Sequence, residues 1–532
     1  MKKFFIGILF LFQHFLVIGQ SQENFQLVIE EDTISGMPGL QSFVHAQVDG
    51  KWLLIGGRTD GLHQRQPFTS FAVAGNNTNI YVVDPEQKQV WTGSLNGLPT
   101  GLVEQLQSTN MEFIQHDDKL YIIGGYGYSA TAADHITFPN LTVVDVPQVV
   151  QAIMNGTSIA SYFKQVTDQR MAVTGGYLGR LDTTFYLVCG QRFDGRYNPM
   201  GMATYVQVYT NEIRKFSILE SGGTLTVQNY SAAQDTANLH RRDYNMLPQR
   251  FPNGESGFTV FSGVFQVGQD LPWLNTVDVR PAGHTVRPGF NQYLNQYHSA
   301  KAAVWDSTAN TMHSIFFGGL SRYTLDTITN TLLDDPNVPF VRTISMITRF
   351  ANDSTVEYKM PVEMPALTGS SAEFIPVITT DDEMIRLNSI PPVKTLIGSI
   401  VGGIESTLPN IFFINTGVES FASTRIFKVY IVKDNTTGIL SNPTPDEALS
   451  VKVFPNPSDA DVNIEVETKI RGNLSIRIFD ASGKEVDTIQ NGPVSPGLHS
   501  YKWKTEHISR GRYYCKIQSG MNERTEAILL NK

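Results

Sequence analysis

The sequence predicts an all-β protein, a six-bladed β-propeller followed by a small β-sandwich. Two observations predict this fold class. Short apolar runs stop six times at a pair of small residues, and successive pairs are 68, 65, 73, 56 and 84 residues apart. After the last repeat the chain changes to short alternating strands separated by Asn, Gly and Pro turns. A repeat this regular indicates one sheet per repeat, with the sheets arranged in a ring.

The first 19 residues have the pattern of a secretory signal peptide. Lys2 and Lys3 precede a mostly apolar stretch, Phe4–Ile18, which ends at Gly19. No Cys follows the apolar run, which argues against a lipoprotein anchor, and no later segment is long and apolar enough to span a bilayer. We therefore expect an exported chain without a transmembrane anchor.

Residues 20–434 contain the six repeats. Each apolar run is too short and too rich in β-branched or aromatic residues for a helix, so it predicts a buried strand. A glycine at the strand end removes Cβ where the backbone must turn and pack closely against a neighbour. The six pairs are Gly56-Gly57, Gly124-Gly125, Cys189-Gly190, Ser262-Gly263, Gly318-Gly319 and Gly402-Gly403.

Two further segments are assigned within this ring. Gly175-Gly176 lies only 14 residues before Cys189-Gly190, so we expect it in the first strand of the same blade rather than in a seventh blade. The isolated strand pattern at Asn24–Glu31 is expected to pair with Ile426–Lys433 and to complete the sixth blade. The ring would then close through one main-chain ladder.

This pattern resembles the kelch repeat, in which four-stranded blades surround a central channel and the second strand ends in Gly-Gly. The first repeat also has the Tyr and Trp of that pattern, as Tyr81 and Trp91. The third and fourth repeats depart from it with Cys-Gly and Ser-Gly. The resemblance implies a six-bladed kelch-like propeller in which the connections after the glycine pairs gather on one face, around the channel mouth.

Residues 435–448 are polar and contain Pro, which predicts a linker, and residues 449–532 predict a seven-strand, immunoglobulin-like sandwich. Three landmarks of this segment, Val453–Pro457, Ile478–Lys484 and Gly511–Tyr514, resemble the type A C-terminal sorting domain of the Bacteroidetes type IX secretion system. The resemblance implies that the secretion machinery is a partner, that the domain is removed after export, and that the protein is released or attached to the cell surface.

Composition gives little indication of a cofactor or of nucleic acid. The formal net charge of −9 is small for 532 residues and gives no reason to propose a nucleic-acid partner. Cys189 and Cys515 each lie in an apolar strand, where a small buried hydrophobe is expected. No metal-ligand spacing or phosphate loop occurs, so we expect no metal and no cofactor.

Arginine and tyrosine gather in the connections that should lie at the channel mouth. Arginine offers a planar fork of donors for a carboxylate or a pair of sugar hydroxyls, and tyrosine offers a stacking face with a polar rim. In the alternative interpretation the arginines only tie down loops by pairing with Asp60, Asp194, Asp243 and Asp326. The candidate ligand-binding residues are Arg58, Tyr126, Arg192, Arg196, Tyr197, His240, Arg241, Arg242, Tyr297, Arg322 and Tyr323.

These residues predict a surface or secreted binding protein whose propeller recognises a glycan or a protein. One alternative is an enzyme acting on an acidic sugar, mutarotase-like or lyase-like, and another is a structural adhesin. Copper-radical oxidases share the propeller architecture but need a Tyr–Cys crosslink and His ligands, and no His pair is placed for this here. Binding is favoured over catalysis; a narrow mouth in which a carboxylate and an arginine converge would favour the enzyme, and a broad flat face the binder.

Overall fold

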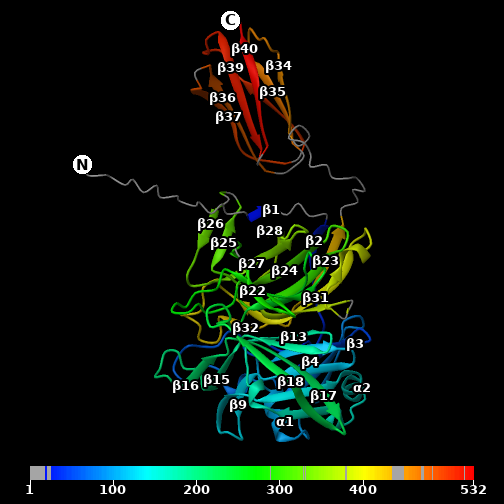
Figure 1. Cartoon of the computed structure of the whole chain (residues 1–532). Coiled ribbons are helices and arrows are strands. Elements are labelled where there is room, and N and C mark those ends of the chain that lie inside the picture. Colours follow the sequence, from blue (N-terminus) through cyan, green and yellow to red (C-terminus); the bar gives the residue numbers. More distant parts are fainter. Residues whose placement is uncertain are drawn as a thin grey trace, which may run out of the picture. The chain divides into compact units, whose positions relative to one another are not determined.

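The chain divides into two compact units, Met1–Asp434 and Asn435–Lys532. Both consist mostly of strands in the computed structural model, which confirms the prediction of an all-β protein (Figure 1). No described helix is long and apolar enough to cross a bilayer. The structure describes residues 18–20, 25–287, 289–327, 329, 331–377, 380, 382–433, 449–468, 472–481, 483–495, 497–519 and 522–531, so the predicted linker and most of the predicted signal peptide lie outside the described residues.

Six sheets of four or more strands dominate the described part of the first unit, each with four antiparallel strands at its centre. Sheet 1 contains β3 (Val44–Val48), β4 (Lys51–Ile55), β5 (Asn79–Asp84) and β6 (Gln89–Ser94). Sheet 2 contains β7 (Glu112–His116), β8 (Lys119–Ile123), β11 (Asn140–Asp145) and β12 (Phe163–Thr167). Sheet 3 contains β13 (Tyr177–Leu181), β14 (Thr184–Val188), β17 (Glu212–Ser221) and β18 (Thr224–Gln234).

The remaining three sheets repeat this order of strands. Sheet 4 contains β19 (Asn245–Arg250), β20 (Ser256–Phe261), β21 (Thr276–Arg280) and β22 (Gly283–Val286). Sheet 5 contains β23 (Ala300–Asp306), β24 (Thr311–Leu320), β27 (Phe340–Arg349) and β28 (Thr355–Glu363), with β1 (Ile18–Gln20) and β30 (Ile385–Arg386) added in parallel at its edges. Sheet 6 contains β29 (Leu367–Pro376), β31 (Thr395–Ser406), β33 (Ile426–Lys433) and β2 (Phe25–Asp32), and β32 (Ser420–Ala422) pairs with β31.

Short hairpins and helices occupy the connections. Three hairpins follow glycine pairs: β9 (Tyr126–Ser129) with β10 (Asp134–Thr137), β15 (Gln191–Gly195) with β16 (Tyr205–Tyr209), and β25 (Tyr323–Asp326) with β26 (Thr331–Asp334). The α-helices are α1 (Thr100–Leu106) and α2 (Val146–Met154). The 3₁₀ helices are η1 (Val73–Gly75), η2 (Ala160–Tyr162), η3 (Gln169–Met171) and η4 (Leu387–Ser389).

The predicted pairs of small residues all lie on the second strand of a sheet or directly after it. Both residues of every pair have a positive φ, between 50° and 93°, a backbone conformation that glycine adopts without strain. A methyl group at Gly124 would also overlap the carbonyl oxygen of Val173 in the next sheet. In sheets 5 and 6 the strand continues past the pair, so there the pair marks a distortion within the strand and not its end.

The second residue of a pair joins its sheet to the next one. Its amide N–H donates to a carbonyl shortly before, or at the start of, the next sheet's first strand, which requires the two backbones to meet without side chains between them. Five pairs form this bond: Gly57 to Ser108 (2.9 Å), Gly125 to Val173 (2.9 Å), Gly190 to Arg241 (2.8 Å), Gly263 to Gln296 (3.1 Å) and Gly403 to Leu40 (2.8 Å). The last of these joins sheet 6 to sheet 1.

A closed cycle of main-chain hydrogen bonds connects the first strands of all six sheets. We call it the main-chain cycle. Each member donates its amide N–H to the carbonyl of the corresponding residue in the neighbouring sheet, at distances between 2.9 and 3.3 Å. In order of donation the members are Ser42, Ser371, His298, Asp243, Gly175 and Asn110, and Asn110 donates back to Ser42.

The predicted pairing of the N-terminal strand is confirmed. β2 pairs antiparallel with β33 from Phe25 with Lys433 to Asp32 with Ile426, so sheet 6 holds both an early and the last strand of this unit. The Gly175-Gly176 pair directly precedes β13, the first strand of sheet 3, in agreement with its assignment to that sheet.

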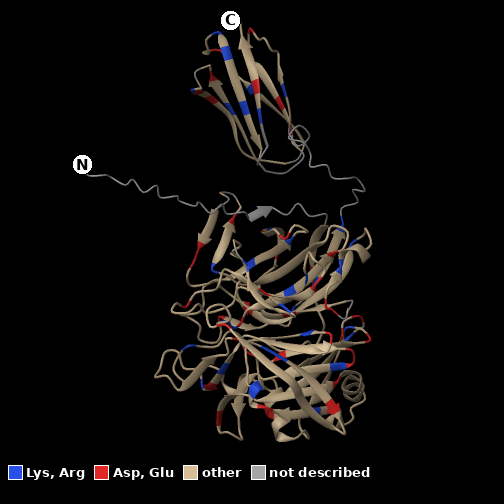
Figure 2. Ribbon diagram, viewed as in Figure 1, with Lys and Arg blue, Asp and Glu red and all other residues tan. Residues whose placement is uncertain are grey.

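Apolar faces pack between neighbouring sheets. Between sheets 4 and 5 they enclose an ion pair, in which Nη1 of Arg349 lies 2.8 Å from Oδ2 of Asp278 and both side chains are less than 10% exposed. Elsewhere acidic and basic residues are interspersed over the ribbon (Figure 2), and most described cations have a neighbouring carboxylate.

The second unit is the predicted seven-strand sandwich. One sheet contains β34 (Leu449–Phe454), β35 (Val462–Thr468) and β38 (Gly497–Trp503), and the other contains β36 (Gly472–Asp480), β37 (Glu485–Val494), β39 (Gly511–Ser519) and β40 (Asn522–Leu530). Trp503 and Cys515 are fully buried between them. Cys189 is 1% exposed in the first unit, so both cysteines are buried as predicted.

Candidate ligand-binding cavity

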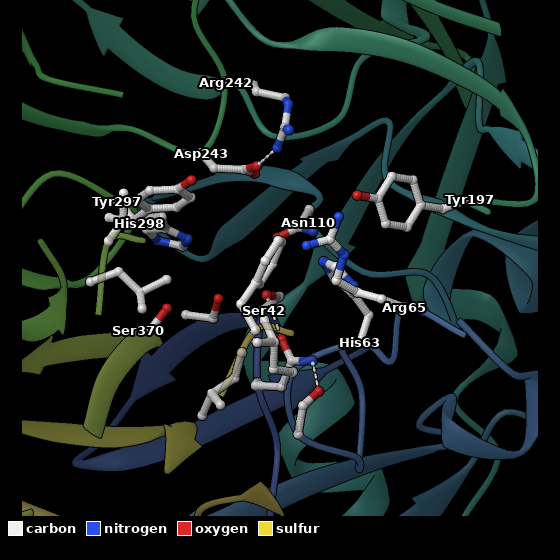
Figure 3. A pocket seen from close by; sticks show the side chains of 18 of the residues that line it. Ser42, His63, Arg65, Asn110, Tyr197, Arg242, Asp243, Tyr297, His298 and Ser370 are labelled. Atoms are coloured by element: carbon white, nitrogen blue, oxygen red, sulfur yellow. Dashed lines mark hydrogen bonds and ion pairs between the residues drawn. The ribbon is translucent and has the colours of Figure 1, made fainter. Parts of the chain in front are cut away.

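A cavity of about 430 Å³ lies over the main-chain cycle. Five members of the cycle line it: Ser42, Asn110, Asp243, His298 and Ser371. Its walls come from connections that follow the pairs of small residues in all six sheets. The repeated strand ends therefore bring segments far apart in the sequence to one concave site (Figure 3).

Aromatic rings form much of one wall, grouped around His63. The imidazole of His63 stacks on Phe71 with ring centroids 5.4 Å apart, and it meets Tyr197 and Phe412 edge-on at 5.0 and 5.9 Å. Burial lowers the pKa of His63 to about 4, and the positive charges of Arg242 and Arg65 act in the same direction. His63 is therefore neutral near pH 7 and adds a polar edge to an otherwise apolar wall.

Two pairs of charged or titratable groups meet at the opposite side of the cavity. The guanidinium of Arg242 contacts the carboxylate of Asp243, lies 5.1 Å from the ring centroid of Phe265, and donates from Nε to the Tyr209 hydroxyl at 3.2 Å. The imidazole Nε2 of His298 lies 3.2 Å from a carboxylate oxygen of Glu373.

Glu373 lines a smaller cavity of about 30 Å³, which shares Ser42, Asn110, Asp243 and His298 with the larger one. Burial by itself raises the pKa of Glu373, but the contact with His298 and the charge of Lys301 outweigh it and hold the pKa below its usual value. Glu373 is thus a buried carboxylate directly behind a cavity-lining imidazole.

Five of the eleven residues proposed from the sequence line the cavity: Arg58, Tyr126, Tyr197, Arg242 and Tyr297. The other six, Arg192, Arg196, His240, Arg241, Arg322 and Tyr323, do not line it. The predicted connections thus contribute to the cavity, but the sequence did not indicate the orientation of each side chain within them.

Arg241 is a structural residue, which corrects its assignment as a ligand-binding residue. Its side chain is fully buried and donates to the carbonyls of Asn238 (2.7 Å), Ser262 (2.6 Å) and Asn275 (2.9 Å). Arg58 lines the cavity but is only 3% exposed and pairs with Asp60 at 2.7 Å. Both arginines hold connections in place, as the alternative interpretation of the sequence expected.

Other candidates are also engaged away from the cavity. Arg192 pairs with Asp194 (2.6 Å), and Arg322 pairs through two nitrogens with Asp334 (2.6 and 2.7 Å), not with the expected Asp326. Arg196 donates to the carbonyl of Ser70 (2.8 Å). His240 stacks on Tyr209 with ring centroids 3.8 Å apart, and Tyr323 lies 4.9 Å below the guanidinium of Arg322.

The candidate set omitted His63, Arg65, His298, Phe412 and Phe413, which line the cavity. The first three stand in the same connections as predicted residues, His63 and Arg65 after Arg58 and His298 after Tyr297, so the sequence pattern could have included them. Phe412 and Phe413 follow the sixth pair, Gly402-Gly403, in a connection from which the sequence analysis proposed no ligand-binding residue. Among the described residues no group of three or more His, Cys, Asp and Glu side chains could hold a metal ion.

Residues 452–531, most of the second unit, match the family described as the secretion system C-terminal sorting domain. This match bears out the resemblance to type IX sorting domains, and it covers none of the cavity. A comparison with curated protein sequences finds no match.

Comparison with solved structures finds remote similarity over most of the chain. The structure of YjhT is 11% identical and covers 76% of this chain and 97% of its own, with a TM-score of 0.43. A fungal alcohol oxidase of the AA5 family, in complex with copper, is 9% identical and covers 94% and 99%, with a TM-score of 0.37. A glycoside hydrolase family 43 arabinoxylan arabinofuranohydrolase from Bacillus subtilis, in complex with cellotetraose, is 10% identical and covers 92% and 95%, with a TM-score of 0.27. With scores this low, no conclusion about activity is drawn from them.

Proposed function

We propose that this protein, which its sorting domain directs to the cell surface or the medium, binds an acidic sugar or the acidic end of a glycan. We propose further that the six sheets form a closed, six-bladed kelch-like propeller and that the cavity is its channel mouth. The main-chain cycle supports this arrangement, because its hydrogen bonds return to the residue from which they start.

The observation that carries the binding function is the concave site itself. Its volume of about 430 Å³ lies within the range of about 300–1,000 Å³ typical of small-molecule sites. Aromatic faces suit the apolar faces of a sugar ring, and arginine suits its carboxylate. A protein ligand or an adhesive contact would be expected to use a broader and flatter surface, so a small acidic ligand is favoured.

A screen of the purified full-length protein against an array of acidic and neutral glycans tests this proposal. Tyr197→Ala removes an aromatic wall of the cavity, and Tyr323→Ala is a matched control because Tyr323 lies outside it. We expect wild type and Tyr323→Ala to bind the same acidic glycans, and Tyr197→Ala to lose at least about tenfold in affinity, which corresponds to about 1.4 kcal/mol. Thermal unfolding of each variant checks that it is folded. Absence of any glycan binding by wild type, or equal losses in both variants, would contradict the proposal.

A second candidate is an enzyme acting on an acidic sugar, and the convergence of Arg242 and Asp243 in a concave mouth favours it. His298 backed by Glu373 adds an imidazole that could exchange protons with a bound hydroxyl group. NMR spectroscopy of the anomers of each bound sugar would detect mutarotation, and ultraviolet absorbance would detect an unsaturated lyase product. If wild type turns a sugar over and His298→Asn lowers the rate at least about tenfold, the result supports an enzymatic function. If wild type binds the sugar without turning it over, the protein is a binding protein.

A further inference from the structure

We infer that Arg65 binds the carboxylate of the ligand, and that the ligand is a monocarboxylate bearing hydroxyl groups rather than a polyanion. This inference rests on the proposed function and specifies the chemistry of the same cavity. It is argued from the partners of the arginines, from the surroundings of Arg65, and from the remaining charges of the lining.

Six of the seven arginines in the connections around the channel mouth already have partners for their donors. Arg58, Arg192, Arg242 and Arg322 each pair with a carboxylate, Arg241 is bound by main-chain carbonyls and Asn275, and Arg196 donates to a main-chain carbonyl. Arg65 differs: among the described residues it forms no ion pair, and its Nε is buried without a hydrogen-bond partner. A buried donor without a partner is costly unless a ligand or water satisfies it.

Aromatic rings hold the guanidinium of Arg65 in place. Its central carbon lies 4.4 Å from the ring centroid of Phe412 and 4.7 Å from that of Phe413. Such cation–π contacts fix the guanidinium without using its N–H groups. The planar fork of donors therefore stays available for a carboxylate, which arginine can bind through two parallel hydrogen bonds.

Arg65 also lies on the cavity side opposite Asp243. Figure 3 shows Arg65, His63 and Tyr197 on one side and Arg242, Asp243, Tyr297 and His298 on the other. His63 is neutral and adds no charge beside Arg65. A ligand carboxylate at Arg65 would therefore avoid Asp243 and extend its ring along the aromatic wall.

The remaining lining charges favour one negative charge on the ligand. Arg58 and Arg242 are neutralised by Asp60 and Asp243, which leaves Arg65 as the cation of the described lining without a carboxylate. The exposed carboxylate of Asp270 also lines the cavity and forms no ion pair among the described residues. It would repel a second anionic group and accept hydrogen bonds from hydroxyls. One cation with one separate carboxylate suits a sugar acid and disfavours a sulfated or phosphorylated polymer.

Isothermal titration calorimetry with matched pairs of probes tests the inference. Each pair is a sugar acid and its methyl ester: glucuronate, galacturonate and N-acetylneuraminate. The ester keeps the ring and removes the charge. We expect the full-length protein to prefer at least one acid over its ester by tenfold or more. Arg65→Gln should reduce this preference to twofold or less while its affinity for the ester changes by less than twofold.

Arg65→Lys and Arg192→Gln are the controls. Lysine keeps the charge but not the planar fork, so part of the preference should remain, and Arg192→Gln should match wild type because Arg192 lies outside the cavity. Thermal unfolding shows whether each variant is folded. If folded Arg65→Gln keeps the wild-type preference, Arg65 is not the carboxylate site and the proposed binding function stands. If heparin binds more tightly than every sugar acid, the monocarboxylate class is wrong. If wild type binds none of the probes, the proposed function fails, and the inference with it.

Discussion

Replacing Gly124 by alanine should destabilise the first unit more than the same change at Gly156. Both glycines have a φ close to 65°, and a left-handed backbone costs an alanine about 1–2 kcal/mol at either position. The surroundings differ. A methyl group at Gly124 would overlap the carbonyl oxygen of Val173, whereas at Gly156 it would meet no atom within 4 Å.

The overlap at Gly124 is with a main-chain atom next to sheet 3. It can be relieved only if the main chains that connect sheets 2 and 3 move apart. Inserting a methyl group into packed surroundings typically costs about 1–3 kcal/mol. We therefore expect Gly124→Ala to lose about 2–5 kcal/mol in total and Gly156→Ala about 1–2 kcal/mol. Because the backbone conformation is the same at both positions, the difference between the two losses measures the cost of the close approach between the sheets.

Urea unfolding followed by tryptophan fluorescence measures both variants against wild type, with calorimetry as an independent check on the transition. Equal losses of unfolding free energy, within about 0.5 kcal/mol, would refute the interpretation of the glycine pair as a joint between sheets. A loss in Gly156→Ala that exceeds the loss in Gly124→Ala would refute it as well.

Three further predictions concern stability, pH and export. Arg349→Met leaves Asp278 buried without its main partner and should cost about 3–5 kcal/mol, whereas Arg192→Met breaks an exposed pair and should cost at most about 1 kcal/mol; urea unfolding compares them. Burial raises the pKa of Glu357 to about 8, above the usual 4.5, so its contribution to stability is complete below pH 4.5 and is lost as the pH rises through 8. Unfolding free energies at several pH values should show this loss in wild type but not in Glu357→Gln. Deletion of residues 449–532 should abolish export, which cell fractionation and immunoblotting of the medium, surface and periplasm detect.

The repeat was readable from the sequence because its physical cause is local. A positive φ at two successive positions restricts the residue type to glycine and a few small side chains. The places where neighbouring sheets meet can therefore be recognised in the sequence as pairs of small residues. The pairing of Phe25–Asp32 with Ile426–Lys433 was also readable, since both segments have a strand pattern and one sheet lacked a strand. The hairpins after the glycine pairs were not predicted, because their polar composition resembles that of loops.

The candidate site was readable only in part, because side-chain direction depends on contacts distant in the sequence. Arg241 and Arg242 are adjacent and chemically alike. Successive residues of an extended segment point to opposite sides, so Arg241 enters the core against Asn275 while Arg242 reaches the cavity. Whether an arginine forms an ion pair depends on contacts that composition does not reveal, and Arg65 forms none with the residues that the structure describes. The aromatic pair Phe412 and Phe413, which holds Arg65, lies more than 340 residues further along the chain.

The main-chain cycle has a consequence for how this protein can change. Each of its bonds joins an amide to a carbonyl, so any residue except proline can keep the bond. Five of its members have a positive φ, which favours Gly, Asn and Asp there, and His298 is outside that restriction. The side chains of the main-chain cycle can therefore be replaced without loss of its hydrogen bonds. A substitution at His298, for example, would alter the chemistry of the cavity lining while the six sheets stay joined. The main chain of these residues joins the sheets, and five of them line the cavity, which makes the main-chain cycle a suitable place to engineer a binding specificity.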